Sequence, residues 1–133
     1  MHPVRLTLRV QNETFAICRL DSKAPVPGWA TSGRFVSITR TSDELSIVCP
    51  QHHVPPGTQH EPDWACLQVE GPLDFALTGI LAGLTAALAR AGISLFAVST
   101  YETDYLLVQR SALEDGIKTL RQEGYQVKHP QTM

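Results

Sequence analysis

Residues Ile93–Val108, ISLFAVSTYETDYLLV, decide the fold expected for this chain. The stretch holds two short apolar runs separated by the polar segment Tyr101–Asp104, a pattern typical of two strands joined by a tight turn. A helical pattern ends at Gly92 before it, and another opens at Ser111 after it. A strand-turn-strand unit framed by two helices is half of a small α+β layer fold.

The two flanking helices have recognisable ends. The first is expected over about residues 75–91, where apolar residues recur at helical spacing, with Asp74 as its N-cap and Gly92 as its C-terminal stop. The second is expected to open with the capping box Ser111-Ala112-Leu113-Glu114 and to end before Gly124.

The rest of the chain is expected to form short strands. Period-2 alternation or short apolar runs predict them at residues 4–10, 15–20, 35–39, 45–49, 64–69 and 125–129, with a turn at Asn12. Pro50–Asp63 holds four prolines and is expected to be an irregular loop. From Trp64 onward the order is β-α-β-β-α-β, which is the ferredoxin-like arrangement.

A faint internal repeat relates the two halves. Ile38–Val48 aligns with Val98–Val108 at a constant offset (108 − 48 = 60), so that apolar, hydroxyl and acidic positions coincide. A repeat of this length fits two tandem units, a degenerate one over residues 1–62 and a complete one over residues 63–133. The alternative is two unrelated hairpins of similar pattern.

The composition excludes several classes of protein. With 133 residues, of which 43% are hydrophobic and 18% charged, the chain can fill a globular core. A formal net charge of −2 argues against binding to nucleic acid. We see no signal peptide and no apolar segment long enough to span a membrane. The odd count of three cysteines favours reduced thiols in a cytoplasmic protein.

The chemistry of the chain concentrates in two segments that this topology can bring together. They are the loop Gly71–Phe75 (GPLDF), which leads into the first helix, and the turn Ser99–Asp104. A helix N-terminus offers unpaired N–H groups to the carboxylate of a free amino acid. Asp104, Glu102 or Asp74 can accept hydrogen bonds from its ammonium group. The alternative is that these residues only cap the helix and stabilise the turn.

The run from Gly71 to Val108 also resembles a known family. Its elements G-P-L-D-F, T-G-I-L, G-I-S-L-F and S-T-Y-x-T-D-Y are similar to the signature of ACT domains, in particular of small stand-alone proteins with tandem ACT units. The same signature resembles the ACT units of a cytosolic arginine sensor and, more distantly, the regulatory domains of aspartate kinase. The resemblance implies tandem ferredoxin-like ACT units and an amino-acid-binding, ligand-sensing role without catalysis or a cofactor.

The resemblance also implies a ligand site and a partner. ACT units usually pair edge to edge, so we expect a homodimer with a free amino acid or similar small ligand bound at or near the interface. Leu77 stands where the arginine sensor has an acidic residue, so arginine specificity does not carry over. The implied ligand-binding residues are Asp74, Leu77, Thr78, Gly79 and Ile80 at the helix start, Thr100, Tyr101, Thr103 and Asp104 in the turn, and Ser94 and Leu95 from the facing unit.

Three other readings remain as alternatives. The first is that the chain serves only as an oligomerisation or protein-contact module that binds no ligand. A zinc site is a second alternative, although the spacing of its donors matches no standard zinc pattern and we expect no metal. Catalysis by serine or cysteine is a third, but the sequence has no nucleophile motif to support it. The residues behind the zinc reading are Cys49, His52, His53, His60, Glu61, Asp63 and Cys66.

Overall fold

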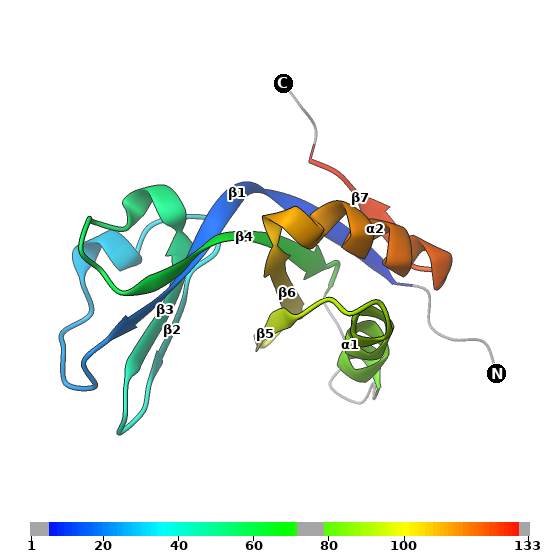
Figure 1. Ribbon diagram of the computed structural model, residues 1–133. Helices are drawn as coiled ribbons and strands as arrows, with labels where there is room; N and C mark the ends of the chain where they lie inside the picture. Colours follow the sequence, from blue (N-terminus) through cyan, green and yellow to red (C-terminus); the bar gives the residue numbers. More distant parts are fainter. Residues whose placement is uncertain (1–5, 72–78, 131–133) are drawn as a thin grey trace. The chain divides into compact units, whose positions relative to one another are not determined.

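The computed structural model describes residues 6–71 and 79–130 of the chain (Figure 1). Two α-helices, seven strands and three single-turn 3-10 helices are seen in these ranges. The strands are β1 (Thr7–Leu20), β2 (Ser37–Arg40), β3 (Leu45–Pro50), β4 (His60–Val69), β5 (Leu95–Ser99), β6 (Asp104–Gln109) and β7 (Gln126–Lys128). The helices are α1 (Ile80–Arg90), α2 (Leu113–Gln122), η1 (Gly28–Ala30), η2 (Gln51–His53) and η3 (Arg110–Ala112).

The chain divides into two compact units. The larger unit combines the residues up to Asn12 with those from Ala65 onward, and the smaller unit comprises Glu13–Trp64. β1 therefore gives its first half to the larger unit and its second half to the smaller one. The internal repeat in the sequence divides the chain differently, into ACT-like units over residues 1–62 and 63–133. That division stays a prediction.

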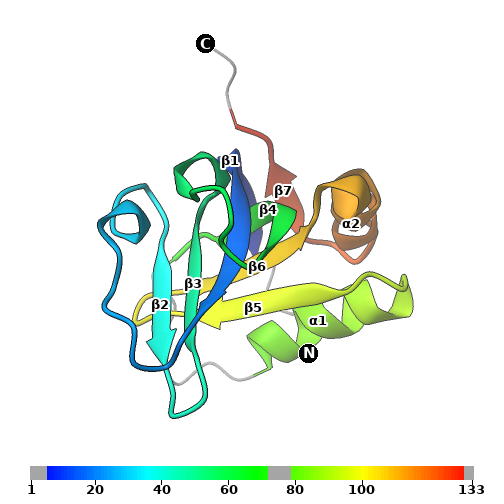
Figure 2. The same ribbon diagram turned by 60° about the vertical axis from the view of Figure 1, so that its left-hand side comes forward.

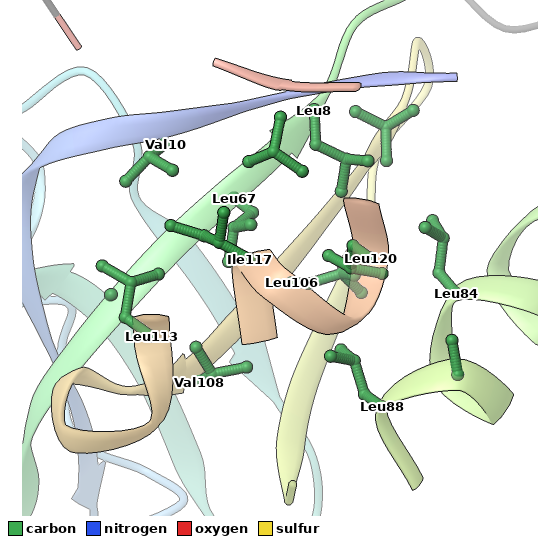
Figure 3. Close-up of a cluster of buried hydrophobic side chains, with 14 of the residues drawn as sticks. Leu8, Val10, Leu67, Leu84, Leu88, Leu106, Val108, Leu113, Ile117 and Leu120 are labelled. Carbon is green, nitrogen blue, oxygen red and sulfur yellow. The ribbon is translucent and has the colours of Figure 1, made fainter. Parts of the chain in front are cut away.

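The larger unit has the α+β architecture that the sequence predicts. Its elements follow the expected order β4-α1-β5-β6-α2-β7. Apolar side chains of the strands meet apolar side chains of both helices in one core (Figure 3). The labelled side chains in this core are Leu8 and Val10 of β1, Leu67 of β4, Leu106 and Val108 of β6, Leu84 and Leu88 of α1, and Leu113, Ile117 and Leu120 of α2.

The first strand of the chain is built into the sheet of the larger unit. The strand order there is β7-β1-β4-β6-β5, with β7 parallel to β1 through the pairs Thr7↔Gln126 and Leu8↔Val127. The predicted turn at Asn12 is wrong, because β1 continues through this residue as one strand of 14 residues. The apolar residues Leu8, Val10, Ala16 and Cys18 stay in the same phase of alternation on either side of Asn12, so no turn is needed to keep them buried.

Both helices of the larger unit end as predicted. Gly92 and Gly124 have positive φ angles of 75° and 98°, and each follows the C-cap residue of its helix, Ala91 for α1 and Glu123 for α2. In each case the next residue donates its N–H back into the helix, from Ile93 to Leu88 at 3.0 Å and from Tyr125 to Leu120 at 3.1 Å. This is the Schellman arrangement, in which glycine avoids the steric cost of a left-handed conformation.

The predicted capping box at the start of α2 is wrong. Ser111 lies inside the 3-10 turn η3, and α2 begins at Leu113 after Ala112, without a side-chain cap. Glu114 and Asp115 nevertheless occupy the first turn, where negative charge favours the helix dipole. The predicted start of the first helix at about residue 75 is also wrong, because α1 begins at Ile80 with the left-handed Gly79 as its N-cap residue. Asp74 is therefore not the N-cap of α1, and it lies outside the described residues.

The smaller unit contains the hairpin β2–β3 with β1 paired to the other side of β3 (Figure 2). Its core is formed by Ala16, Cys18, Ala30, Leu45, Ile47 and Cys49. No α-helix lies between residues 13 and 64; irregular segments and the turns η1 and η2 occupy the stretches between the strands. β4 begins at His60, inside the segment predicted to be a loop, and Asp63 within it has a positive φ of 67°.

The two hairpins are closed by the same kind of turn. The N–H of Thr41 donates to the carbonyl of Glu44 at 2.9 Å, and that of Thr100 donates to the carbonyl of Thr103 at 2.8 Å. In both turns the threonine hydroxyl also accepts the N–H of the later residue, Glu44 or Thr103. Aligned on these turns, the hairpins differ by 59 positions (100 − 41 = 59) rather than by the predicted 60. This register superimposes the buried Ile47 on the buried Leu106.

Candidate functional site

A buried hydroxyl joins the β5–β6 turn to the end of β4. Thr103 is only 5% exposed, and its Oγ1 donates to the carbonyl oxygen of Val69 at 2.6 Å. Val69 is the last residue of β4, and from there the chain continues through Gly71 toward α1. The turn is therefore held beside the end of β4, and the expected approach of the Gly71–Phe75 loop to it stays a prediction.

A serine fixes the orientation of the Asp104 carboxylate. Ser99 and Asp104 face each other across the hairpin, and Ser99 Oγ donates to Asp104 Oδ1 at 2.6 Å. A carboxylate has about four lone-pair positions on its two oxygens, so one hydroxyl leaves it with capacity to accept further hydrogen bonds. The carboxylate is half-buried, and the serine hydroxyl holds it in place. Ser99 was not among the predicted ligand residues, but its place opposite Asp104 in a hairpin was the signal for this role.

The tip of the turn is polar and exposed. Tyr101 is 82% exposed, and Glu102 beside it is also exposed. Burial raises the pKa of Tyr105 on the adjoining strand, and the negative charge of Glu102 raises that pKa further. The turn thus carries two acidic side chains, Glu102 and Asp104.

Two basic side chains of the larger unit are paired with Glu70. Arg9 Nη2 donates to Glu70 Oε1 at 2.8 Å, and Lys128 Nζ donates to the same oxygen at 3.4 Å. The hydrogen bond from Arg9, together with the charge of Lys128, lowers the pKa of the Glu70 carboxyl. Both cations thus bind Glu70, and Glu70 directly follows Val69, which accepts the hydrogen bond from Thr103.

The predicted helix-start residues are described only in part. Gly79 has a positive φ of 79° and precedes α1, and its carbonyl accepts the N–H of Gly83 at 2.9 Å. Ile80 is the first residue of α1 and packs against the core of the larger unit. Asp74, Leu77 and Thr78 lie outside the described residues.

The two residues predicted to act from a facing unit lie at the start of β5. Ser94 is exposed, whereas Leu95 is partly buried and packs against the core of its own unit. Within residues 6–71 and 79–130, β5 is the last strand of its sheet and pairs with β6. The structure therefore brings Thr100, Thr103 and Asp104 together in one turn, whereas Ser94 directly precedes β5.

The donors behind the zinc alternative are dispersed. Cys49 and Cys66 are buried in β3 and β4, whereas His52 and His60 are exposed. Among residues 6–71 and 79–130, no group of three or more His, Cys, Asp or Glu side chains is placed to hold a metal ion. In the same part of the chain, no helix combines the length and the apolar character needed to cross a membrane.

Two family models match the sequence, and their boundaries follow the compact units. A model described as an N-terminal domain matches residues 13–57, and a model described as an ACT domain matches residues 59–122. No curated protein matches the sequence.

One solved structure is similar over nearly the whole chain. Protein Atu0741 from Agobacterium tumefaciens is 38% identical, with 98% of this chain and 97% of that chain covered and a TM-score of 0.92. The chain belongs to the ACT-domain proteins, in the same family as this relative.

More distant structures are similar in fold. A protein of unknown function, VC0802 from Vibrio cholerae, described as a possible transport protein, is 16% identical over 90% of each chain, with a TM-score of 0.73. The regulatory subunit of aspartate kinase from Thermus thermophilus is 12% identical over 85% of this chain and 95% of that chain, with a TM-score of 0.57. At these identities the likeness concerns the fold alone.

Proposed function

We propose that this ACT-domain protein is a non-catalytic regulatory module that binds a free amino acid or a similar small ligand. The observation that carries the proposal is the Ser99–Asp104 hydrogen bond, because it orients a half-buried carboxylate next to Thr103, whose hydroxyl is bonded to the end of β4. In this arrangement Asp104 accepts the ammonium group of the ligand, and backbone N–H groups at the helix start receive its carboxylate. Asp74, Leu77 and Thr78 belong to this second wall by resemblance to the family.

The turn is suited to a binding role because its backbone is held independently of a ligand. The Thr103–Val69 bond anchors one end, and the bonds between Thr100 and Thr103 close the loop. A pre-organised site loses less conformational entropy on binding. The exposed Tyr101 adds an aromatic side chain to the same turn, and Gly79 and Ile80 stand at the start of α1.

We also propose that the active form is a homodimer in the cytoplasm. No strand of the described residues pairs with the outer edge of β5, so this edge is where a second copy would pair, and Ser94 and Leu95 at the start of the strand then face the partner's turn. The three cysteines are free and buried, which suits a reducing compartment.

A thermal-shift screen with the twenty amino acids tests the binding proposal. We expect at least one of them, at millimolar concentration, to raise the melting temperature of the folded protein. Asp104→Asn is expected to abolish that shift, while Asp43→Asn in the turn of the other hairpin leaves it unchanged. The Asp43 variant makes the same charge change at an exposed turn, so it controls for electrostatics alone.

The second candidate is a protein-contact module that has no ligand. The outer edge of β5 favours it equally, since an edge strand can pair with another chain whether or not a pocket is present. A screen in which none of the twenty amino acids shifts the melting temperature, on protein that is demonstrably folded and dimeric, would favour this candidate.

A further inference from the structure

Two buried cysteines of the smaller unit stand next to each other in its core. Cys18 on β1 is 1% exposed and Cys49 on β3 is 0% exposed. In the antiparallel register Cys18 faces Ile47, and Cys49 faces Ala16. The two cysteines are therefore diagonal neighbours on one face of the paired strands, and they belong to the same apolar cluster.

The two thiols also differ in reactivity. A hydrogen bond from the Cys49 thiol lowers the pKa of Cys18 despite its burial, and the charge of His60 lowers that pKa further. Donating the same hydrogen bond, together with burial, raises the pKa of Cys49. Because the thiolate is the nucleophile, Cys18 is the member of the pair that attacks an oxidant first.

The cover over this pair is irregular rather than helical. The partly buried side chains packed on the cluster include Ala24, Trp29, Val36 and Val54. These residues lie in loops or in the turn η1, outside the α-helices and the strands. Segments of this kind open locally at a lower free energy than strands or helices in a core, which admits a small oxidant.

We propose that Cys18 and Cys49 are an oxidation site that forms a reversible disulfide with a peroxide as oxidant. The Cys18 thiolate attacks one peroxide oxygen, the O–O bond breaks, and Cys18 becomes a sulfenic acid as water leaves. The Cys49 thiolate then attacks the Cys18 sulfur and displaces its hydroxyl as a second water. Two thiols are oxidised to one disulfide, and one hydrogen peroxide is reduced to two waters.

The diagonal placement predicts that this disulfide is easily reduced. Diagonal partners in antiparallel strands have Cα atoms about 7–8 Å apart, beyond the range of about 4.4–6.8 Å usual for disulfides. Closing the bond therefore strains β1 against β3, and strained disulfides have more oxidising potentials. The site is thus suited to reversible modification rather than to permanent cross-linking.

The pair can be tested by counting thiols in the intact protein. The full chain is treated with hydrogen peroxide, unfolded, alkylated and weighed by mass spectrometry. We expect two of its three thiols to escape alkylation, a mass loss of two hydrogen atoms before alkylation, and full reversal by dithiothreitol. Peptide mapping should join the peptide of Cys18 to that of Cys49.

Variants and controls make the result decisive. Cys66→Ala should form the disulfide like the parent, because Cys66 is buried in the other unit and burial raises its pKa to about 12. Cys18→Ala and Cys49→Ala should each abolish it, with circular dichroism confirming the fold. Peptide mapping of the unsubstituted protein identifies the disulfide even if a cysteine variant does not fold. Three alkylatable thiols after oxidation, a disulfide to Cys66 or one between two chains would overturn the proposal.

Discussion

Replacing Thr103 by valine removes one hydroxyl and little else, because the two side chains have nearly the same shape. The Oγ1 of Thr103 donates to the carbonyl of Val69 at 2.6 Å, and both residues are buried. Leaving a buried acceptor without its donor costs about 1–3 kcal/mol, so we expect Thr103→Val to lower the free energy of unfolding by about 2 kcal/mol. For a domain of this size that corresponds to a fall of roughly 8 °C in melting temperature.

Urea denaturation monitored by circular dichroism measures this change directly. Thr39→Val, in the exposed edge strand β2, is the matched control and should change the free energy of unfolding by less than about 0.5 kcal/mol. Thr103→Ser keeps the hydroxyl and should retain most of the stability. If Thr103→Val were as stable as the parent, the hydrogen bond would not anchor the turn to β4.

Three further predictions concern α2, the β5 edge and alkaline pH. Gly116→Ala should stabilise the fold by about 0.5–1 kcal/mol in denaturation experiments, because alanine favours a helix and its Cβ would lie at an ordinary contact distance, 3.8 Å, from Leu88; a loss of stability would show that α2 packs more tightly. In an antiparallel pair, the N–H groups of alternate residues point toward the partner strand and away from it. The N–H of Thr100 points toward β6, so the N–H of Ala97, three residues earlier, points away from β6 toward the outer edge of the sheet. Light scattering should then find the parent chain dimeric and Ala97→Pro monomeric but folded, whereas a proline variant that stays dimeric would exclude this edge. Because burial raises the pKa of the Cys66 thiol from 9.0 to about 12, the folded state holds its proton longer, and stability against urea should fall as the pH rises from about 9 toward 12, with Cys66→Ala reducing this slope.

The fold of the larger unit was predictable because its signals are local. The hairpin at Ile93–Val108 and the glycines that end both helices depend on residues close in sequence, and the structure confirms them. The place of β1 between β7 and β4 depends on pairing between residues more than 100 positions apart, such as Thr7 and Gln126. The hydrophobic periodicity of one segment does not indicate which distant strand pairs with it.

Errors of one or a few residues also have physical causes. Asn12 is a residue type that favours turns. The alternation of apolar residues nevertheless continues unchanged on either side of it, which also allows one continuous strand, and tertiary packing selects the strand. Ser111 and Glu114 have the spacing of a capping box, but a 3-10 turn takes the place of the cap. The repeat was displaced by one position because side-chain type, unlike the turn hydrogen bonds of Thr41 and Thr100, does not fix the register.

The candidate site was predictable to the level of the turn. The resemblance to ACT domains pointed to Thr100, Thr103 and Asp104, and all three lie in the β5–β6 connection or at its end. The separate tasks of these residues were not visible in the sequence. Thr103 bonds to the end of β4 and Ser99 orients Asp104, and both roles depend on contacts made only in the folded chain.

A structure of the protein with an amino acid that raises its melting temperature tests the central claim most directly. The account predicts the ligand's ammonium group within hydrogen-bonding distance of Asp104, and its carboxylate against the backbone at the start of α1. A ligand bound elsewhere, or one that places its carboxylate against Asp104, would contradict the account.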